Sequence, residues 1–206
     1  FFISNIFFYI NSIEYGAPES FLKPFLHTWS VSIEIQFYIF ISILFFIIFK
    51  YFRSSLIPLI IILFILSFFV AMYLSFYKTN FNFYFFPSRV WEFLSGSILV
   101  LLETRYKDYK SKQFNKYLPI IGLLLILYSI FFFKIENFSP NFQSIVPVLG
   151  ISMIIFFIEK NSILYKFLSS NLMTSSGKIS YSLYLWHYPI IVFAFINKSS
   201  LDQELK

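Results

Sequence analysis

The sequence contains no cysteine, so disulfides and thiolate metal sites are excluded. Charged residues make up only 13% of the 206 residues, whereas a soluble domain carries about a quarter. The chain also lacks the G-x-x-x-x-G-K-S/T, H-E-x-x-H and G-x-S-x-G patterns. A soluble core is therefore a poor fit, and ATP-driven pumps, zinc proteases of that type and α/β-hydrolases find no support.

Long apolar runs dominate the chain instead. Apolar residues make up 58% of it, and the mean hydropathy is +0.74. The runs are about 20 residues long, enough to cross roughly 30 Å of hydrocarbon, and in lipid the backbone must pair within its own segment. We therefore expect an all-α, polytopic transmembrane helix bundle with about six full spans and a partial apolar segment at its start. The spans are expected at about residues 30–49, 55–76, 84–102, 117–134, 142–158 and 179–196.

Basic residues fix the expected orientation of these spans. The net charge of +6 suits nucleic acid in principle, but the basic side chains lie in short loops beside the apolar runs. Ten of the 16 fall in alternate loops, most densely in RYKDYKSKQFNK at residues 105–116. The positive-inside rule places that loop in the cytoplasm, and we expect no nucleic-acid partner.

A polar stretch, LHTWSVSIEIQFY, begins the first expected span at its outer end. Helical spacing puts His27, Ser30 and Glu34 on one face. A carboxylate there can orient an imidazole as a base or bind sugar hydroxyls. The simpler alternative is an interfacial Trp29 anchor with Ser30 as a helix N-cap. We expect Trp29 to anchor the helix at the interface and Glu34 to have a role in the site, because an acid buried in a membrane helix is costly and usually functional.

Two further polar clusters stand out. In FFPSRVWEF, Arg89 and Glu92 are three residues apart and can pair on one helix face, which by itself suits a plain interfacial ion pair. In GKISYSLYLWHYPII, Pro189 cannot donate to the Leu185 carbonyl, so we expect a kink and a free carbonyl beside His187. A histidine hydrogen-bonded to a neighbouring helix is the alternative. The orientation directs all three clusters to a cavity open to the outer half of the membrane.

Four segments, in order, resemble the membrane acyltransferase-3 family, the O-acetyltransferases of bacterial cell-surface glycans. The first, HTWSVSIEIQFYIF, is similar to the family signature HTWSLSVEEQFY, with Ile35 in place of the family's second acid. The others are FPSRVWEFLSGSILVLL, SIVPVLGISMII and GKISYSLYLWHYPIIVF, the last with Tyr188 where tryptophan is usual.

The resemblance implies a multi-pass enzyme of the bacterial inner membrane that works within the lipid bilayer. It implies transfer of an acyl group, usually acetyl from cytoplasmic acetyl-CoA, to a hydroxyl of an extracytoplasmic polysaccharide or lipopolysaccharide O-antigen. No resident metal or cofactor is expected. The expected catalytic residues are Glu34, His27 and His187. The expected substrate-binding residues are Trp29, Ser30, Gln36, Tyr38, Arg89, Trp91, Glu92 and Trp186.

The family's first helix carries a basic residue followed by a histidine, and neither falls in this chain. We therefore expect residues 1–206 to be part of one membrane acyltransferase domain, with the first helices and any C-terminal SGNH domain outside it, and to be inactive alone. A glycan transporter, flippase or polymerase-like protein is the rival, but such a protein favours a basic cavity and internal repeats. A purely structural anchor has no need of a buried Glu34 or His187.

Overall fold

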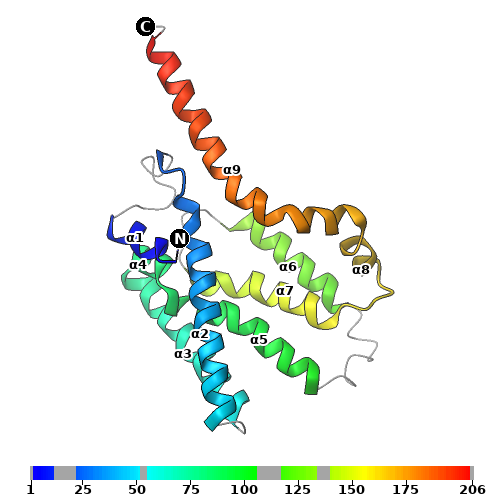
Figure 1. Ribbon diagram of the computed structural model, residues 1–206. Coiled ribbons are helices and arrows are strands. Elements are labelled where there is room, and N and C mark those ends of the chain that lie inside the picture. Colours follow the sequence, from blue (N-terminus) through cyan, green and yellow to red (C-terminus); the bar gives the residue numbers. More distant parts are fainter. Residues whose placement is uncertain (1, 12–21, 52–54, 106–116, 134–139, 205–206) are drawn as a thin grey trace. The chain divides into compact units, whose positions relative to one another are not determined.

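The computed structural model describes residues 2–11, 22–51, 55–105, 117–133 and 140–204. All regular structure in these ranges is helical, as expected (Figure 1). The chain forms two compact units, Phe1–Gln36 with Ser169–Lys206, and Phe37–Leu168. Most of the basic loop that was expected to face the cytoplasm, residues 106–116, lies outside the described residues.

The first unit holds α1 (Ser4–Ile10), the short 3-10 helix η2 (Leu26–Thr28), the start of α2 (Trp29–Tyr51), and α9 (Asn171–Glu204). The second unit holds the rest of α2 and the remaining helices. These are α3 (Leu56–Tyr77), α4 (Thr79–Tyr84), η4 (Phe86–Ser88), α5 (Val90–Arg105), α6 (Leu118–Phe132), η8 (Phe142–Ser144), α7 (Ile145–Phe157) and α8 (Ile163–Leu168).

Three helical segments among the described residues are long and apolar enough to cross a membrane: Leu26–Tyr51, Leu56–Tyr77 and Asn171–Asn197. The expected spans near 84–102, 117–134 and 142–158 are also helical, but α5, α6 and α7 have only 16, 15 and 13 residues. The structure thus bears out an all-helical membrane protein, while the count of about six spans stays a prediction.

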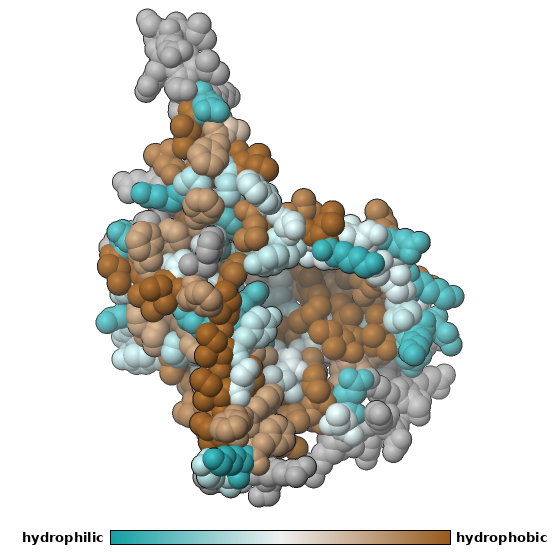
Figure 2. Space-filling view, in the orientation of Figure 1, coloured by the Kyte–Doolittle hydropathy of each residue, from teal (hydrophilic) through white to brown (hydrophobic). Residues whose placement is uncertain are grey.

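Large apolar side chains are exposed along these helices. On α2 they include Ile43, Phe46 and Phe49, and Figure 2 shows a continuous hydrophobic column over this helix. Water-soluble proteins seldom expose contiguous apolar surface on this scale. The exposed faces are therefore suited to contact with lipid chains.

Prolines mark where several helices begin. Pro58, Pro119 and Pro147 lie in the first turns of α3, α6 and α7, where a missing N–H removes no helical hydrogen bond. Pro189 is different, because it lies inside α9. Figure 1 shows that α9 changes direction along its length, and a kink at Pro189 itself stays a prediction.

The core of the second unit lies where α3 packs against α5. Ile60 of α3 and Leu94 of α5 are fully buried there, together with Phe37 and Val90. A neighbouring cluster buries Trp91 against Ala71 and Met72 of α3. Burial of these side chains holds the start of α5 in place. Arg89 directly precedes this helix and Glu92 lies in its first turn, and together they form the Arg89 cluster.

Helices α6 and α7 pack backbone to backbone at two glycines, Gly122 and Gly150. A Cβ atom added to Gly122 would lie 2.5 Å from the Gly150 carbonyl oxygen, and one added to Gly150 would lie 2.7 Å from the Gly122 oxygen. Small residues permit this close approach of two helices in lipid, where hydrophobicity does little to drive association.

The glycine contact predicts that Gly150→Ala destabilises the protein by about 1–3 kcal/mol, because a rigid backbone carbonyl blocks the new methyl group. Gly96→Ala is the matched control, since a Cβ at Gly96 in α5 meets nothing within 4 Å. Unfolding of the purified protein in detergent, followed by helical circular dichroism, gives the difference. Equal midpoints for the two variants would contradict the close packing.

Candidate active site

A cluster of aromatic and histidine rings lies in the first unit around His27. His27 is 2% exposed and sits in η2, just before α2. The ring centroids of Tyr184, His187 and Tyr188, all on α9, lie 5.2, 5.3 and 5.4 Å from that of His27. The structure therefore brings together His27 and His187, which the sequence placed 160 residues apart as separate candidates.

The hydroxyl of Tyr184 connects α9 to the start of α2. It donates to the backbone carbonyl of His27 at 2.6 Å and is also hydrogen-bonded to Ser30 Oγ. A phenol has one proton, so Ser30 donates to Tyr184 while Tyr184 donates to the carbonyl. These two bonds tie the backbone that directly follows the His27 side chain to α9.

The ring of His27 lacks conventional partners. Neither of its nitrogens has a hydrogen bond among the described residues, although both are buried. The carbonyls of Pro24 and Leu185 approach the ring, and Leu185 is the residue whose carbonyl Pro189 leaves without a helical donor. Leaving a buried polar group unpaired costs about 1–3 kcal/mol, so such a group indicates a role beyond packing.

The second histidine has a defined tautomer. His187 Nδ1 lies 2.6 Å from the backbone oxygen of Tyr184, in the preceding turn of α9. A carbonyl only accepts, so Nδ1 carries the proton and Nε2 presents its lone pair. Because His187 is exposed, this nitrogen is accessible as a base or a hydrogen-bond acceptor.

The other predicted residues of this unit have different surroundings. Glu34 is exposed and makes no hydrogen bond or ion pair with any described residue, so its expected contact with His27 is not seen. Trp29 is half-buried and Trp186 is 66% exposed. The side chain of Gln36 is bonded to other residues of the same unit. Its Nε2 donates to the Phe2 carbonyl at 3.0 Å and to Asn5 Oδ1 at 2.9 Å.

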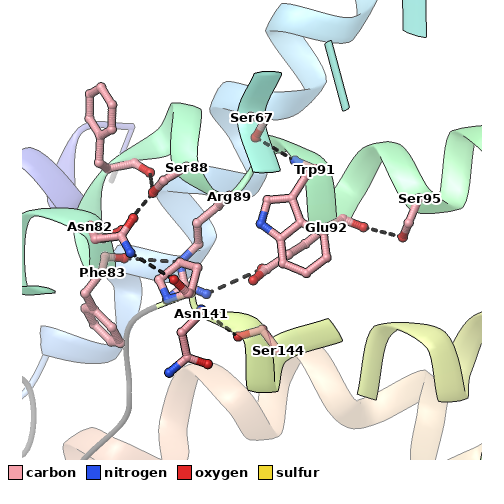
Figure 3. A network of polar contacts seen from close by, with 12 residues as sticks. Ser67, Asn82, Phe83, Ser88, Arg89, Trp91, Glu92, Ser95, Asn141 and Ser144 are labelled. Atoms are coloured by element: carbon pink, nitrogen blue, oxygen red, sulfur yellow. Dashed lines mark hydrogen bonds and ion pairs between the residues drawn. The ribbon is translucent and has the colours of Figure 1, made fainter. Parts of the chain in front are cut away.

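The Arg89 cluster belongs to the second unit (Figure 3). The predicted ion pair is present, with Arg89 Nη1 3.4 Å from Glu92 Oε2. Arg89 Nε also donates to the Phe83 carbonyl at 3.1 Å, and the guanidinium lies 5.2 Å from the centre of the Phe83 ring. These contacts hold the arginine against the protein, and its predicted contact with substrate stays a prediction.

Trp91 is 1% exposed and packs edge-on against Phe64 and Phe68, which favours a packing role. Its indole Nε1 has no hydrogen-bond partner among the described residues. Asn82 is fully buried, and its Nδ2 donates to the carbonyls of Ala71 and Pro140 at 3.0 and 2.9 Å. Tyr38, on α2, is 62% exposed.

Sequence reasoning missed Ser67, which caps α5 from another helix. Its Oγ accepts from the backbone N–H of Trp91 at 2.9 Å (Figure 3). The same Oγ donates to the Pro87 carbonyl at 2.6 Å. The first N–H groups of a helix have no partner within the helix, and Ser67 of α3 satisfies one of them. No local motif could reveal this bond, because Ser67 lies 24 residues before Trp91.

Comparison with known proteins identifies the class. The sequence model of the acyltransferase-3 family, described as an acyltransferase domain, matches residues 1–198, and the chain belongs to this family. The O-acetyltransferase OatA of Staphylococcus aureus, from strains NCTC 8325, COL and MRSA252, is 29% identical over 204 residues.

That similarity covers 94% of this chain and 34% of OatA, so the chain spans about a third of the length of these relatives. No solved structure matches the chain significantly.

The buried cap predicts that Ser67→Ala destabilises the protein by about 1–3 kcal/mol, because the Trp91 N–H and the Pro87 carbonyl both lose their partner. Ser75→Ala on the same helix is the control, since Ser75 Oγ donates to the Met72 carbonyl of its own helix. Thermal unfolding in detergent compares the two variants, and the midpoint of Ser67→Ala is expected to be the lower one. A Ser67→Ala midpoint equal to that of Ser75→Ala would exclude the capping role.

Proposed function

We propose that the protein moves an acyl group, acetyl in the first instance, from cytoplasmic acyl-CoA to a hydroxyl of an extracytoplasmic glycan. The acceptor is a cell-surface polysaccharide or lipopolysaccharide O-antigen, and the enzyme is a multi-pass protein of the bacterial inner membrane. The family and the O-acetyltransferase relatives support acyl transfer to oxygen. The donor and the acceptor are our proposal.

The observation that carries the proposal is the pair of imidazoles, 5.3 Å apart, in a chain of this family. His187 Nε2, left unprotonated by the bond from Nδ1 to Tyr184, takes the proton of the acceptor hydroxyl. The acceptor oxygen then attacks the thioester carbonyl, a C–O bond forms, and the C–S bond breaks. The thiolate of coenzyme A leaves and takes up a proton.

The remaining predicted residues have supporting roles in this proposal. His27 packs against the ring of His187 and supports the position of that base. Glu34, exposed on α2, orients the acceptor hydroxyl. In the first unit, Trp29, Ser30 and Trp186 contact the acceptor or the acyl group. The substrate contacts expected of Tyr38, Arg89 and Glu92 stay predictions, whereas Gln36 is bound by α1 and Trp91 is packed in the core.

The proposal predicts that His187→Gln lowers acetyl transfer by about 10²–10⁴-fold, the usual loss when a general base is removed. The assay measures O-acetyl groups on surface polysaccharide in cells that depend on the full-length protein, with protein level followed by immunoblot. Glu34→Gln in the same assay is expected to lower acetylation as well, because an amide binds a hydroxyl less strongly than a carboxylate.

Ser182→Ala, at an exposed position of the same helix, is expected to retain full acetylation. Full acetylation by His187→Gln at normal protein level would refute the role of that histidine as base. Full acetylation by Glu34→Gln alone would remove Glu34 from the mechanism and leave the histidine proposal standing.

A further inference from the structure

Several hydrogen bonds attach helix α1 to the rest of the first unit. It has seven residues, and only Asn5 and Phe8 among them are buried. A helix this short is marginal by itself, so its position depends on what it binds. Asn5, which is 2% exposed, makes the largest share of those bonds.

The side chain of Asn5 forms a reciprocal amide pair with Gln36 of α2. Asn5 Oδ1 accepts from Gln36 Nε2 at 2.9 Å, and Asn5 Nδ2 faces Gln36 Oε1 at 3.4 Å. Gln36 Nε2 also donates to the Phe2 carbonyl, which fixes which end of this amide is the nitrogen. The orientation of both amides therefore follows from the hydrogen bonds themselves.

Ser32, one turn before Gln36, completes the network. Its fully buried Oγ donates to Asn5 Oδ1 at 2.6 Å and accepts from the Asn5 backbone N–H at 3.1 Å. Asn5 is thus bound through both its backbone and its side chain. An amide suits this position because it accepts two hydrogen bonds and donates one at the same time, without burying a charge.

The same helix also contacts the turn that carries His27. Ser4 Oγ donates to the Thr28 carbonyl at 2.9 Å, directly after His27. Neither nitrogen of the His27 ring has a hydrogen bond among the described residues, so the direction of the ring is set by packing and by the backbone that bears it. Contacts that fix residues 28–36 consequently fix the imidazole.

We propose that Asn5 is a positioning residue that holds the His27 turn in place through Ser32 and Gln36. The inference rests on the proposed function for its effect on catalysis, but not for its effect on the structure around His27. It also gives Gln36 a specific task, since both ends of its amide are engaged by α1 and Asn5 rather than directed to a ligand.

The test uses the full-length protein in nanodiscs, treated with diethyl pyrocarbonate, with the modification of each histidine followed by mass spectrometry of its peptide. Wild-type His27 is buried and should react slowly, while exposed His187 serves as the internal reference. Asn5→Ala is expected to speed modification of His27 by about tenfold or more at an unchanged His187 rate, because the turn opens more often.

Asn11→Ala is the matched control, because Asn11 Nδ2 donates to the Phe7 carbonyl of its own helix at 2.7 Å. A His27 rate in Asn5→Ala equal to that in Asn11→Ala overturns the proposal. If Asn5→Ala does not accumulate, Gln36→Ala, which removes the partner amide, takes its place with the same two outcomes.

Acetyl transfer supplies the catalytic readout. We expect Asn5→Ala to lower kcat by about tenfold with the KM for acetyl-CoA unchanged, since a displaced imidazole impairs the chemical step and not donor binding. Unchanged kcat would overturn the positioning role. Absence of transfer by the wild-type protein would instead refute the proposed function, and the His27 modification rates would still decide the role of Asn5.

Discussion

The hydroxyl of Tyr184 makes the contact on which the candidate site depends. It bonds to the His27 carbonyl and to Ser30, and so connects the last long helix to the beginning of α2, 157 residues away in the chain. His27 is 2% exposed, so little solvent competes for its carbonyl and the bond is favoured over its absence. The grouping of two histidines and two tyrosines follows from it.

The positions of the long helices could be predicted from the sequence, because a long apolar run in lipid must be helical. The boundaries of α2 and α3 agree with the expected spans, whereas α9 extends beyond the expected residues 179–196 at both ends. The number of spans did not follow. Composition does not reveal that α7 has 13 residues or that two glycines bring its backbone against α6.

In the candidate site, too, local features could be predicted from the sequence and long-range contacts could not. His27, His187 and the Arg89–Glu92 pair could be selected from residue type and helical spacing, and the ion pair was correctly predicted because both partners are local. The bonds from Tyr184, Asn5 and Ser67 could not, since each joins residues more than 20 positions apart without periodicity. Gln36 shows the consequence, because its polar side chain suggested ligand binding and instead holds α1.

The central claim is that the Tyr184 hydroxyl keeps the His27 turn in a form that supports acyl transfer. The most direct measurement compares Tyr184→Phe with Tyr181→Phe, at an exposed tyrosine on the same helix, in membranes supplied with labelled acetyl-CoA. The account predicts an initial rate of acetyl transfer to glycan about tenfold lower in Tyr184→Phe alone, at equal protein level. Equal rates in the two variants would contradict it.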